Sequence, residues 1–323
     1  MSFKIDAVIT WVDGDDPRHK AKRGQYGDKR LLNRDDVAGS TRYSSLGEIF
    51  YCVASLNRFA PWLNKIYIVT DEQNPMVDEF IAKHFPEGSI PVEIVDHKVI
   101  FRGYEEHLPT FNSISIESMT WRIPGLAEHY IEFNDDLILA APTQPEDFFT
   151  NDGKVVCYGK RYSALYVKLS HLLRRHRDGS KKVSFRQTKL NAAQLLGKRS
   201  SFIKIYHTPK PLLRSVYEQY FAEHTDHLVA NISHRFRHAS QYNVEELHYL
   251  LLKKEGRLTM RRAYDDLLYL TPKSDVAYIE KRLALFDKSP QCKFGCFNSL
   301  DMMPEEARVK TIQWIANRIG IKE

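Results

Sequence analysis

The sequence is poor in cysteine, with four in 323 residues. So few thiols do not make the disulfide framework of a small secreted domain, and they are typical of a protein in a reducing compartment. Cys292 and Cys296 are separated only by Lys-Phe-Gly, and no second cysteine or histidine pair at zinc-finger spacing accompanies them. We therefore expect Cys52, Cys157, Cys292 and Cys296 to be reduced, partly buried thiols rather than zinc ligands.

Long apolar runs are also absent. No stretch approaches the roughly 18 consecutive apolar residues of a transmembrane helix. Residues 1–8 (MSFKIDAV) have neither the apolar core nor the small-residue cleavage site of a signal peptide. We therefore expect a cytoplasmic protein without a membrane-spanning segment.

Several common catalytic signatures are missing as well. The sequence contains no Walker A loop, no GxGxxG after a strand, no GxSxG and no HExxH. These absences argue against a P-loop kinase, a dinucleotide-dependent enzyme, a serine hydrolase and a zincin protease. We also find no internal repeat and no low-complexity tract.

What remains is an ordinary globular composition with a slight excess of positive charge. Hydrophobic residues make up 43% and charged residues 27%, and the formal net charge is +6. The length suits two domains, or one large α/β domain with an insertion. Residues 171–182 (HLLRRHRDGSKK) concentrate five Arg and Lys side chains. This segment is either a solvated helix end and loop or a contact for an anionic partner such as a phosphorylated substrate or a lipid surface; no nucleic-acid module signature is present.

The first 150 residues alternate strand and helix patterns. Short β-branched runs predict four buried strands, helical spacing of apolar residues predicts three helices between them, and residues 18–40 read as a polar loop. This alternation predicts an α/β, Rossmann-like fold with a mostly parallel sheet and helices on both faces. The expected strands are 5–12, 65–70, 91–95 and 130–133, and the expected helices are 46–59, 75–84 and 113–121.

The pattern changes after residue 150. We expect one strand at 155–158 and then a largely helical C-terminal portion. Residues 1–150 would thus form an α/β portion and residues 151–323 a mostly helical portion of one continuous unit. The expected helices are about 187–197, 210–224, 244–255, 274–286 and 304–318.

Acidic residues follow several of the predicted strands. Asp13 follows the first strand, Asp71 the second, and Asn134-Asp135-Asp136 the fourth. In a parallel sheet the carboxyl ends of the strands form the ligand-binding edge. Two adjacent carboxylates there would suit Mg²⁺ or Mn²⁺ bound to a pyrophosphate, although Asn-Asp-Asp is also common turn chemistry.

Two basic motifs in the second half allow two readings each. His207 begins a rigid loop (HTPKP) before a predicted helix that carries Arg214 on its first turn, and residues 235–238 read RFRH. A histidine beside basic residues suits phosphate binding or proton transfer, and arginine suits bidentate phosphate contacts. Local sequence alone favours structural or solvent-exposed roles for both motifs.

Taken together, these segments resemble the Stealth protein family. Residues 5–17 (IDAVITWVDGDDP) resemble the first characteristic region, residues 42–75 the second, and residues 108–139 the third. His207 to Arg214, Arg237-His238 and residues 297–301 (FNSLD) resemble fragments of the fourth region and its flanks.

The resemblance implies a sugar-1-phosphate transferase of bacterial capsule or cell-surface polysaccharide synthesis, similar to the catalytic part of animal N-acetylglucosamine-1-phosphotransferase. Such an enzyme would move a hexose-1-phosphate or N-acetylhexosamine-1-phosphate from a UDP-sugar to a hydroxyl of a polysaccharide or undecaprenyl-linked oligosaccharide. UMP would leave and a phosphodiester would remain. The resemblance also implies Mg²⁺ or Mn²⁺ as cofactor and a cytoplasmic location, with possible peripheral contact at the inner face of the membrane.

The resemblance further implies that residues 1–150 bind the nucleotide-sugar and that residues 151–323 complete the active site of one continuous catalytic unit. It also assigns roles to individual residues. His207 would accept the proton, Arg42, Arg237 and His207 would contact the pyrophosphate, and Asn112 and Glu117 would line the pocket. The animal enzyme has Asn in place of the second acidic residue of the first region, so we do not expect Asp13 to be indispensable. The metal ligands would be Asp135, Asp136 and Asp301. The remaining substrate-binding candidates are Asp6, Trp11, Asp13, Glu48, Asn134, Arg214, His238 and Asn298.

Two other function classes stay open at the level of the sequence. A metal-dependent nucleotide-sugar glycosyltransferase would use the same strand-end carboxylates but would cleave the anomeric C–O bond and release UDP. A non-catalytic surface or nucleic-acid-binding protein would depend on the basic segment 171–182 and would bind in a steeply salt-dependent way.

Overall fold

The structure is a computed structural model, and it describes residues 3–27, 32, 46–165, 183–198, 200–261, 268–271 and 275–321. Within these ranges, none of the helices has both the length and the apolar character needed to span a bilayer.

Five strands form the central sheet, in the order β3-β2-β1-β4-β8. The first four are parallel to one another, whereas β8 is antiparallel to β4. The central strands β1, β2 and β4 are rich in Ile, Val and aromatic side chains and are buried along most of their length, as expected for strands covered on both faces. The bounds are Ile5–Thr10 for β1, Lys65–Thr70 for β2, Val92–Asp96 for β3, His129–Asn134 for β4 and Lys210–Leu213 for β8.

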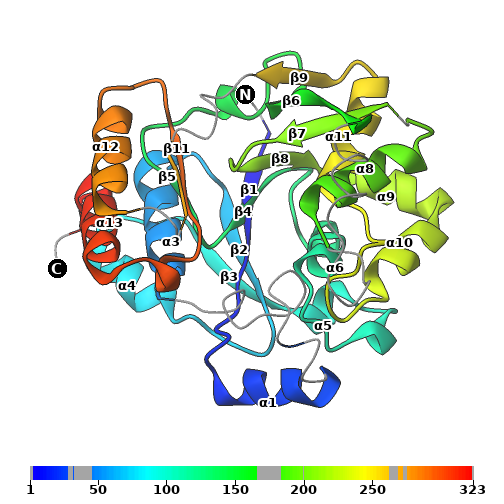
Figure 1. Cartoon of the computed structure of the whole chain (residues 1–323), viewed down its shortest axis with the longest axis horizontal. Helices are drawn as coiled ribbons and strands as arrows, with labels where there is room; N and C mark the ends of the chain where they lie inside the picture. Colours follow the sequence, from blue (N-terminus) through cyan, green and yellow to red (C-terminus); the bar gives the residue numbers. More distant parts are fainter. Residues whose placement is uncertain are drawn as a thin grey trace.

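Helices flank the central sheet on two sides (Figure 1). One side holds α3 (Glu48–Phe59), α4 (Val77–His84), α12 (Val276–Asp287) and α13 (Glu305–Ile319). The other side holds α5 (His97–Ile100), α6 (Ser113–Glu117), α8 (Phe185–Leu195), α9 (Arg214–Glu223), α10 (Thr225–Ile232) and α11 (Val244–Lys254). The helix α1 (Pro17–Tyr26) lies beyond the carboxyl end of β1.

Two smaller sheets complete the fold. One has the order β10-β11-β5 and the other β7-β6-β9. In the first, β11 is antiparallel to β5, which follows the acidic turn after β4, so the C-terminal part of the chain reaches this turn. The bounds are Leu137–Leu139 for β5, Tyr269–Leu270 for β10 and Phe294–Phe297 for β11, with Val155–Ser163 for β6, Ser201–Ile205 for β7 and Leu258–Arg261 for β9.

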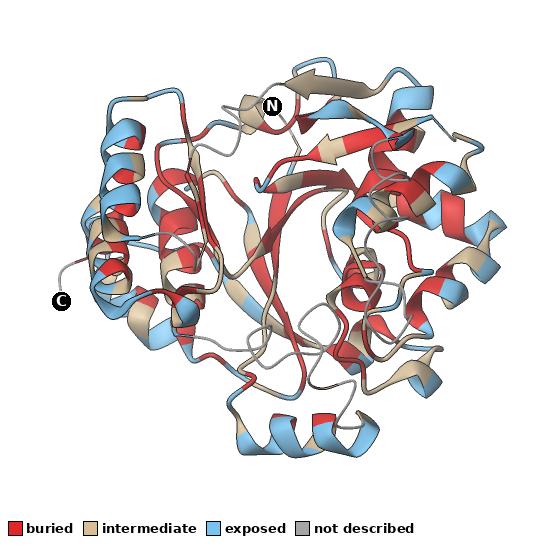
Figure 2. Cartoon of the chain, in the orientation of Figure 1, coloured by how far each residue is buried: buried red, intermediate tan, exposed pale blue. Residues whose placement is uncertain are grey.

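The core runs through the centre of the molecule. Figure 2 shows buried residues along β1, β4 and β8, while α1 and the outer faces of α12 and α13 are mostly exposed. All four cysteines are thiols buried in this core. Several charged side chains are buried with them, among them Glu132 on β4 and Glu245 and Glu246 on α11.

The predicted α/β class with a mostly parallel sheet is confirmed, and so are the four strands and the helices at 46–59 and 75–84 expected before residue 150. The helix expected over 113–121 is shorter, because α6 ends at Glu117 and a separate 3-10 turn follows at Thr120–Arg122. Two local predictions are wrong. Residues 18–40 were expected to be a loop, but residues 17–26 form α1 because Asp16 caps its first turn and Pro17 occupies its first position. Residues 210–224 were expected to be one helix, but residues 210–213 form the edge strand β8. The C-terminal portion also contains short strands that the sequence did not predict.

Candidate active site

The carboxyl ends of the parallel strands meet at one edge of the central sheet. β1 ends at Thr10, which pairs with Val69 of β2 and Asn134 of β4, so the chain leaves all three strands at the same level. The segments that follow carry the acidic residues predicted there: Asp13 after β1, Asp71 after β2, and Asp135 and Asp136 after β4.

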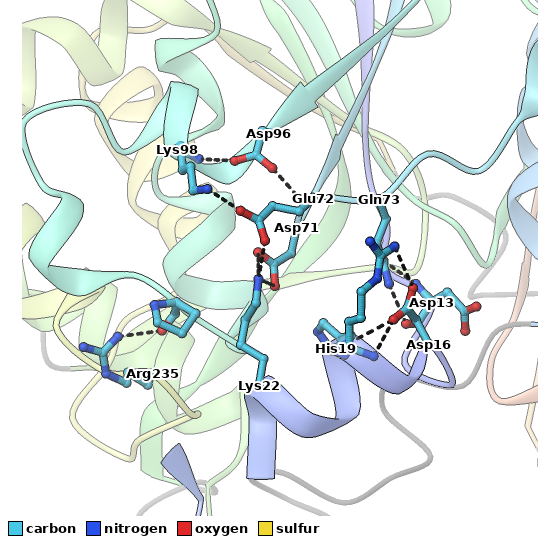
Figure 3. Close-up of polar contacts among 12 residues, drawn as sticks. Asp13, Asp16, His19, Lys22, Asp71, Glu72, Gln73, Asp96, Lys98 and Arg235 are labelled. Carbon is cyan, nitrogen blue, oxygen red and sulfur yellow. Dashed lines mark hydrogen bonds and ion pairs between the residues drawn. The ribbon is translucent and has the colours of Figure 1, made fainter. Parts of the chain in front are cut away.

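Ion pairs join α1 to the ends of β2 and β3 (Figure 3). The Nζ of Lys22 on α1 lies 3.0 Å from Asp71 and 3.0 Å from Glu72. Glu72 also pairs with Lys98, and its backbone N–H donates to Asp96 at 2.7 Å. Because Asp71 is buried and Lys22 half-buried, this network fixes α1 beside the strand ends.

Asp13 belongs to a turn that is closed by its own hydrogen bonds. Its carboxylate accepts the backbone N–H of Asp15 at 2.8 Å, while its backbone N–H and C=O bind the side-chain amide of Gln73 at 2.9 Å each. Trp11, half-buried, donates its backbone N–H to Val69 at 3.0 Å. Both predicted residues therefore lie at the carboxyl edge, with Asp13 held in a stable turn.

The acidic turn after β4 is anchored by the C-terminal part of the chain. The backbone C=O of Asp136 accepts the N–H of Phe297 at 2.9 Å. One carboxylate oxygen of Asp136 lies 3.4 Å from Nδ2 of Asn298 and 3.6 Å from the Sγ of Cys296. The structure thus brings the predicted residues Asn298 and Asp136 together across some 160 positions of sequence.

Several acidic side chains influence one another at this turn. Burial raises the pKa of Asp135 well above its usual range, and the neighbouring charges of Asp136 and Glu48 raise it further. The pKa of Glu48, at the start of α3, is raised by burial and by the charges of Asp136 and Asp301. Burial likewise raises the pKa of Asp136. These four acids form what we call the acidic cluster: Glu48, Asp135, Asp136 and Asp301.

Two basic side chains act on the acidic cluster, one at the start of β8 and one in the loop just before it. The charges of His207 and Lys210 both lower the pKa of Asp136, against the effect of burial. His207 is exposed, and its ring stacks on Tyr269 with the ring centroids 3.9 Å apart and the planes 8° from parallel. The stack constrains the orientation of the imidazole on the surface of the protein.

A second group of predicted residues lies around the start of α6. Asn112 is buried and caps α6, and its Nδ2 donates to Gln241 and to the backbone C=O of His234 at 2.9 Å each. Arg237 donates to Ser113 at 2.6 Å. Asn112 therefore has a structural role, because its hydrogen bonds support the loop that carries Arg237.

The side chains of this loop are held by aromatic and hydroxyl groups. The guanidinium of Arg237 lies 4.6 Å from the ring centroid of Phe185. The exposed His238 stacks on His234, and both rings contact the hydroxyl of Ser240, at 2.7 Å and 3.1 Å. Glu117, at the other end of α6, is buried and acts electrostatically on Lys210.

Two candidates lie at the amino-terminal end of the parallel strands, opposite the acidic turn. Asp6 is buried near the start of β1, about 13 Å along the strand from Thr10, and accepts hydrogen bonds from Asn64 and the backbone of Ala127 at 2.7 Å each. Arg214 follows the last residue of β8 and pairs with Glu218 at 3.8 Å. Because β8 is antiparallel, its end lies at the amino end of β4. The structure gives Asp6 a role in joining strand and loop, and it does not bring Arg214 to the acidic cluster.

Some of the predicted features lie outside the described residues. Arg42 and the basic segment 171–182 fall in the ranges that the structure does not describe.

The residues of the acidic turn fit a divalent cation in their chemistry. Asp135 and Asp136 are adjacent and half-buried, and the charge of Asp136 raises the pKa of Asp135. Mg²⁺ is typically held by one or two carboxylates together with phosphate oxygens and water. Among the described residues, no three His, Cys, Asp or Glu side chains converge as a ready-made metal site.

Sequence reasoning missed two residues next to the site. Lys210 forms a buried ion pair with Glu245 of α11, and Tyr269 orients His207. The position of Lys210 in the HTPKP motif was a signal, but its partner lies 35 residues away on another element. Tyr269 gave no local signal, because a single aromatic residue in a short strand is ordinary core composition.

Comparison with family models matches two parts of the chain. Residues 3–30 match Stealth protein CR1, conserved region 1, and residues 42–157 match Stealth protein CR2, conserved region 2. The segments 42–75 and 108–139 were predicted to be the second and third regions of the family, but both belong to region 2.

Curated relatives are polysaccharide phosphotransferases by name. Receptor polysaccharide phosphotransferase WefC of Streptococcus oralis is 32% identical over 75% of this chain and 76% of the relative. Capsular polysaccharide phosphotransferase LcbA of Neisseria meningitidis is 31% identical over 75% of this chain and 62% of the relative. Exopolysaccharide phosphotransferase SCO6021 of Streptomyces coelicolor is 42% identical over 47% of this chain but only 26% of its own length, so the match spans about a quarter of that relative.

Solved structures show a weaker likeness. The glycosyltransferase GlyE of Streptococcus pneumoniae TIGR4 is 9% identical, with 98% of this chain and 62% of the other covered at a TM-score of 0.41. A likeness at this level carries no argument about function.

Proposed function

The chain belongs to the Stealth family, and on this premise we propose that it is a polysaccharide phosphotransferase that transfers a sugar-1-phosphate. The donor would be a UDP-sugar carrying a hexose or N-acetylhexosamine. The acceptor would be a hydroxyl group of a polysaccharide or a lipid-linked oligosaccharide. The observation that carries the proposal is the acidic cluster at the carboxyl edge of the sheet, with His207 beside it, in a chain whose relatives bear phosphotransferase names.

The reaction we propose is an in-line displacement at phosphorus. The acceptor oxygen forms a bond to the phosphorus next to the sugar, the bond from that phosphorus to the bridging oxygen breaks, and UMP leaves with that oxygen. The acceptor hydroxyl loses its proton, which a ring nitrogen of His207 would take up. The exposed ring of His207, fixed by Tyr269, is suited to this task because it is accessible and its orientation is constrained.

The negative charge that develops on the leaving group requires stabilisation. Asp135 and Asp136, with Asp301, would hold Mg²⁺ or Mn²⁺, which when bound would neutralise charge on the pyrophosphate. Arg237 would contribute a guanidinium for phosphate oxygens, held by Ser113 and Phe185. Arg42 stays a candidate for the same role.

The acceptor would bind between the acidic cluster and the loop 233–243. Glu117 of α6 stays a candidate for lining this pocket, and the loop contacts α6 through Asn112 and Ser115. A lipid-borne acceptor would also bring the chain to a membrane surface.

The deciding experiment identifies the nucleotide released. Purified protein is incubated with Mg²⁺, candidate UDP-sugars and an oligosaccharide acceptor, and the nucleotides and the phosphate content of the product are measured. We expect UMP, with one phosphate retained in the product for each UMP formed. Release of UDP with no phosphate in the product would instead identify a glycosyltransferase and would contradict the proposal.

A further inference from the structure

The loop 233–243, which joins α10 to α11, reaches the carboxyl edge of the central sheet. Its Phe236 is buried in one apolar cluster with Phe111, and Val12, two residues beyond the end of β1, packs against that cluster. The two phenyl rings stack with their centroids 5.3 Å apart. The loop is therefore attached to the segment that leaves β1, at the edge where the proposed function places the donor.

Buried amide side chains hold the backbone of this loop. The Oε1 of Gln241 accepts the backbone N–H of His238 at 2.9 Å, and its Nε2 donates to the backbone C=O of Asn231 at 2.7 Å. Asn191 of α8 donates to the C=O of Ala239 at 3.0 Å and to that of Gln241 at 2.7 Å. The backbone that carries His238 is thus fixed at its own N–H and at the next C=O.

Ser240 decides which nitrogen of His238 carries the proton. The backbone N–H of Ser240 donates to Nδ1 of His238 at 3.3 Å, and the hydroxyl of Ser240 lies 2.7 Å from the same nitrogen. A backbone N–H can only donate, so Nδ1 must supply a lone pair. A neutral imidazole then has its proton on the other nitrogen, and the exposed ring of His238 presents an N–H donor at Nε2.

His234 completes a chain of hydrogen bonds that leads to this nitrogen. Its ring stacks on that of His238, with the centroids 4.4 Å apart and the planes 18° from parallel, and its Nε2 lies 3.1 Å from the hydroxyl of Ser240. The hydroxyl has a single proton, so it donates to His238 and accepts from Nε2–H of His234. Burial lowers the pKa of His234, which favours the neutral ring in the stack.

The loop offers hydrogen-bond donors and positive charge to a ligand. Residues 233–243 contain Arg235, Arg237 and two histidines but no Asp or Glu. An exposed imidazole N–H beside arginine suits a ligand oxygen that only accepts hydrogen bonds. A phosphate oxygen has this character, whereas a sugar hydroxyl also has a proton to donate.

We propose that His238 donates a hydrogen bond from Nε2 to a phosphate oxygen of the donor, and that Ser240 is the positioning residue that holds the ring for this contact. The inference rests on the proposed function. The Nε2 of His238 already carries its proton and the Nδ1 lone pair is used by Ser240. His238 is therefore a hydrogen-bond donor and does not repeat the role of His207 as proton acceptor.

The first test measures UDP affinity by titration calorimetry in the presence of excess Mg²⁺. The amide nitrogen of a glutamine can take the place of Nε2, whereas that of an asparagine reaches only the place of Nδ1. We therefore expect His238→Gln to keep UDP affinity within about threefold and His238→Asn to lose about tenfold.

Two substitutions of Ser240 test its positioning role by the same measurement. Ser240→Ala removes the hydroxyl and should weaken UDP binding about threefold to tenfold, while Ser240→Thr keeps the hydroxyl and should restore the affinity. Ser233→Ala is the matched control in the same loop, because the hydroxyl of Ser233 contacts only the helical C=O of Ala230 at 3.2 Å. It should leave UDP affinity unchanged.

The second test observes the imidazole of His238 directly by NMR of protein labelled with ¹⁵N in histidine. Its signals are identified by their absence from His238→Gln. At pH 8 we expect a protonated Nε2 and an unprotonated Nδ1, and Ser240→Ala should reduce the share of this form. UDP with Mg²⁺ should shift the Nε2 signal of His238, whereas uridine, which lacks phosphate, should not.

The outcomes separate this inference from the proposed function. A proton on Nδ1 of His238, or equal UDP affinity in His238→Gln and His238→Asn, would overturn the phosphate contact. Unchanged UDP affinity in Ser240→Ala would overturn the positioning role. Each of these results leaves the proposed function standing, because release of UMP tests it independently. Failure of the unaltered protein to bind UDP with Mg²⁺ would instead contradict the proposed donor, and the inference with it.

Discussion

Asp135 and Asp136 are adjacent carboxyl groups, and burial disfavours the ionised form of both. Burial raises the pKa of both carboxyl groups, and the charge of Asp136 raises that of Asp135 further. The hydrogen bonds from Asn298 and Cys296 lower the pKa of Asp136 and so offset part of the effect of burial there. Without a bound cation, such a pair weakens the fold at neutral pH, since burial and repulsion favour a protonated carboxyl in the folded state only. This is the usual cost of a site built for a charged ligand.

The first prediction follows for Asp135→Asn. We expect turnover to fall at least a hundredfold, because a proposed metal ligand is lost, while the melting temperature at pH 7.5 without metal rises by a few degrees. The pKa of Asp135 is raised in the folded state, so its contribution to stability is present at low pH and is lost as the pH rises through that pKa. The gain in melting temperature should therefore vanish in acid.

Thermal unfolding with and without Mg²⁺ and a turnover assay check this prediction together. Asp152→Asn is the control, because Asp152 is exposed in a turn and pairs with Lys154 at 2.7 Å, away from the site. A variant of Asp135 that is less stable than the unaltered protein, or that keeps its activity, would contradict the interpretation.

At this scale the sequence predicted position better than role. Asp135 and Asp13 lie at strand ends because the strands themselves were easy to recognise. Asp6 lies in β1, the strand that Asp13 follows, but four residues of extended chain separate it from the carboxyl end of that strand at Thr10. Asn112 is a helix cap, a role that depends on where α6 begins.

Among the described elements, α1 is attached largely by polar and aromatic contacts. Its mean composition is polar, so little apolar burial holds it in place. Its first turn depends on the Asp16 cap, and its body is tied to the sheet by Lys22. Local opening should therefore occur in α1 before the central strands open.

We predict that Asp16→Ala opens α1 without unfolding the protein. The variant removes the acceptor for the backbone N–H groups of Arg18 and His19, so amide hydrogen exchange across residues 17–26 should accelerate about fivefold to tenfold. Exchange in β1 and β4 should not change. Asp15→Ala is the matched control, since Asp15 carries the same charge, is exposed and caps nothing. Equal acceleration in both variants would show that charge, not capping, matters.

The edge strand β8 shows why parts of the fold could not be predicted from local sequence. The run 210–224 has helical spacing throughout, and β8 contains Pro211, which local rules count against a strand. β8 is a strand because it pairs with β4, about eighty positions away in the sequence. It lies at the edge of the sheet, where a proline is tolerated. Tertiary pairing therefore decides the structure here, as it does for the short strands β10 and β11.

Across the whole molecule, buried ionisable groups give stability a pH dependence of both signs. Burial raises the pKa of Glu132 to about 7 and that of Glu246 to about 8. Their contribution is present in acid and is lost as the pH rises through these values. Burial lowers the pKa of His97 to about 4 and that of His248 to about 3, so their contribution is present above pH 6.5 and is lost as the pH falls. Maximum stability is thus expected in weakly acidic solution.

We predict that Glu246→Gln stabilises the protein only on the alkaline side. The amide oxygen still accepts the backbone N–H of Ile203, which Glu246 binds at 2.6 Å, but no buried charge forms as the pH rises. Melting temperatures should match those of the unaltered protein near pH 4.5 and exceed them by a few degrees at pH 8.5. Glu255→Gln, with the same charge change at an exposed position, serves as the control. A gain that is equal at both pH values would refute the assignment.

The position of β8 at the edge of the central sheet also matters while the chain is being made. Four strands of this sheet are complete once residue 134 has left the ribosome, yet the strand that covers β4 ends only at residue 213. Throughout that interval β4 is an open edge that any other extended chain can pair with. Glu132 projects from this edge strand, and its charge opposes such pairing until Lys210 arrives opposite it. The carboxylate that lies buried in the finished protein is thus, during synthesis, a charge on an open edge strand.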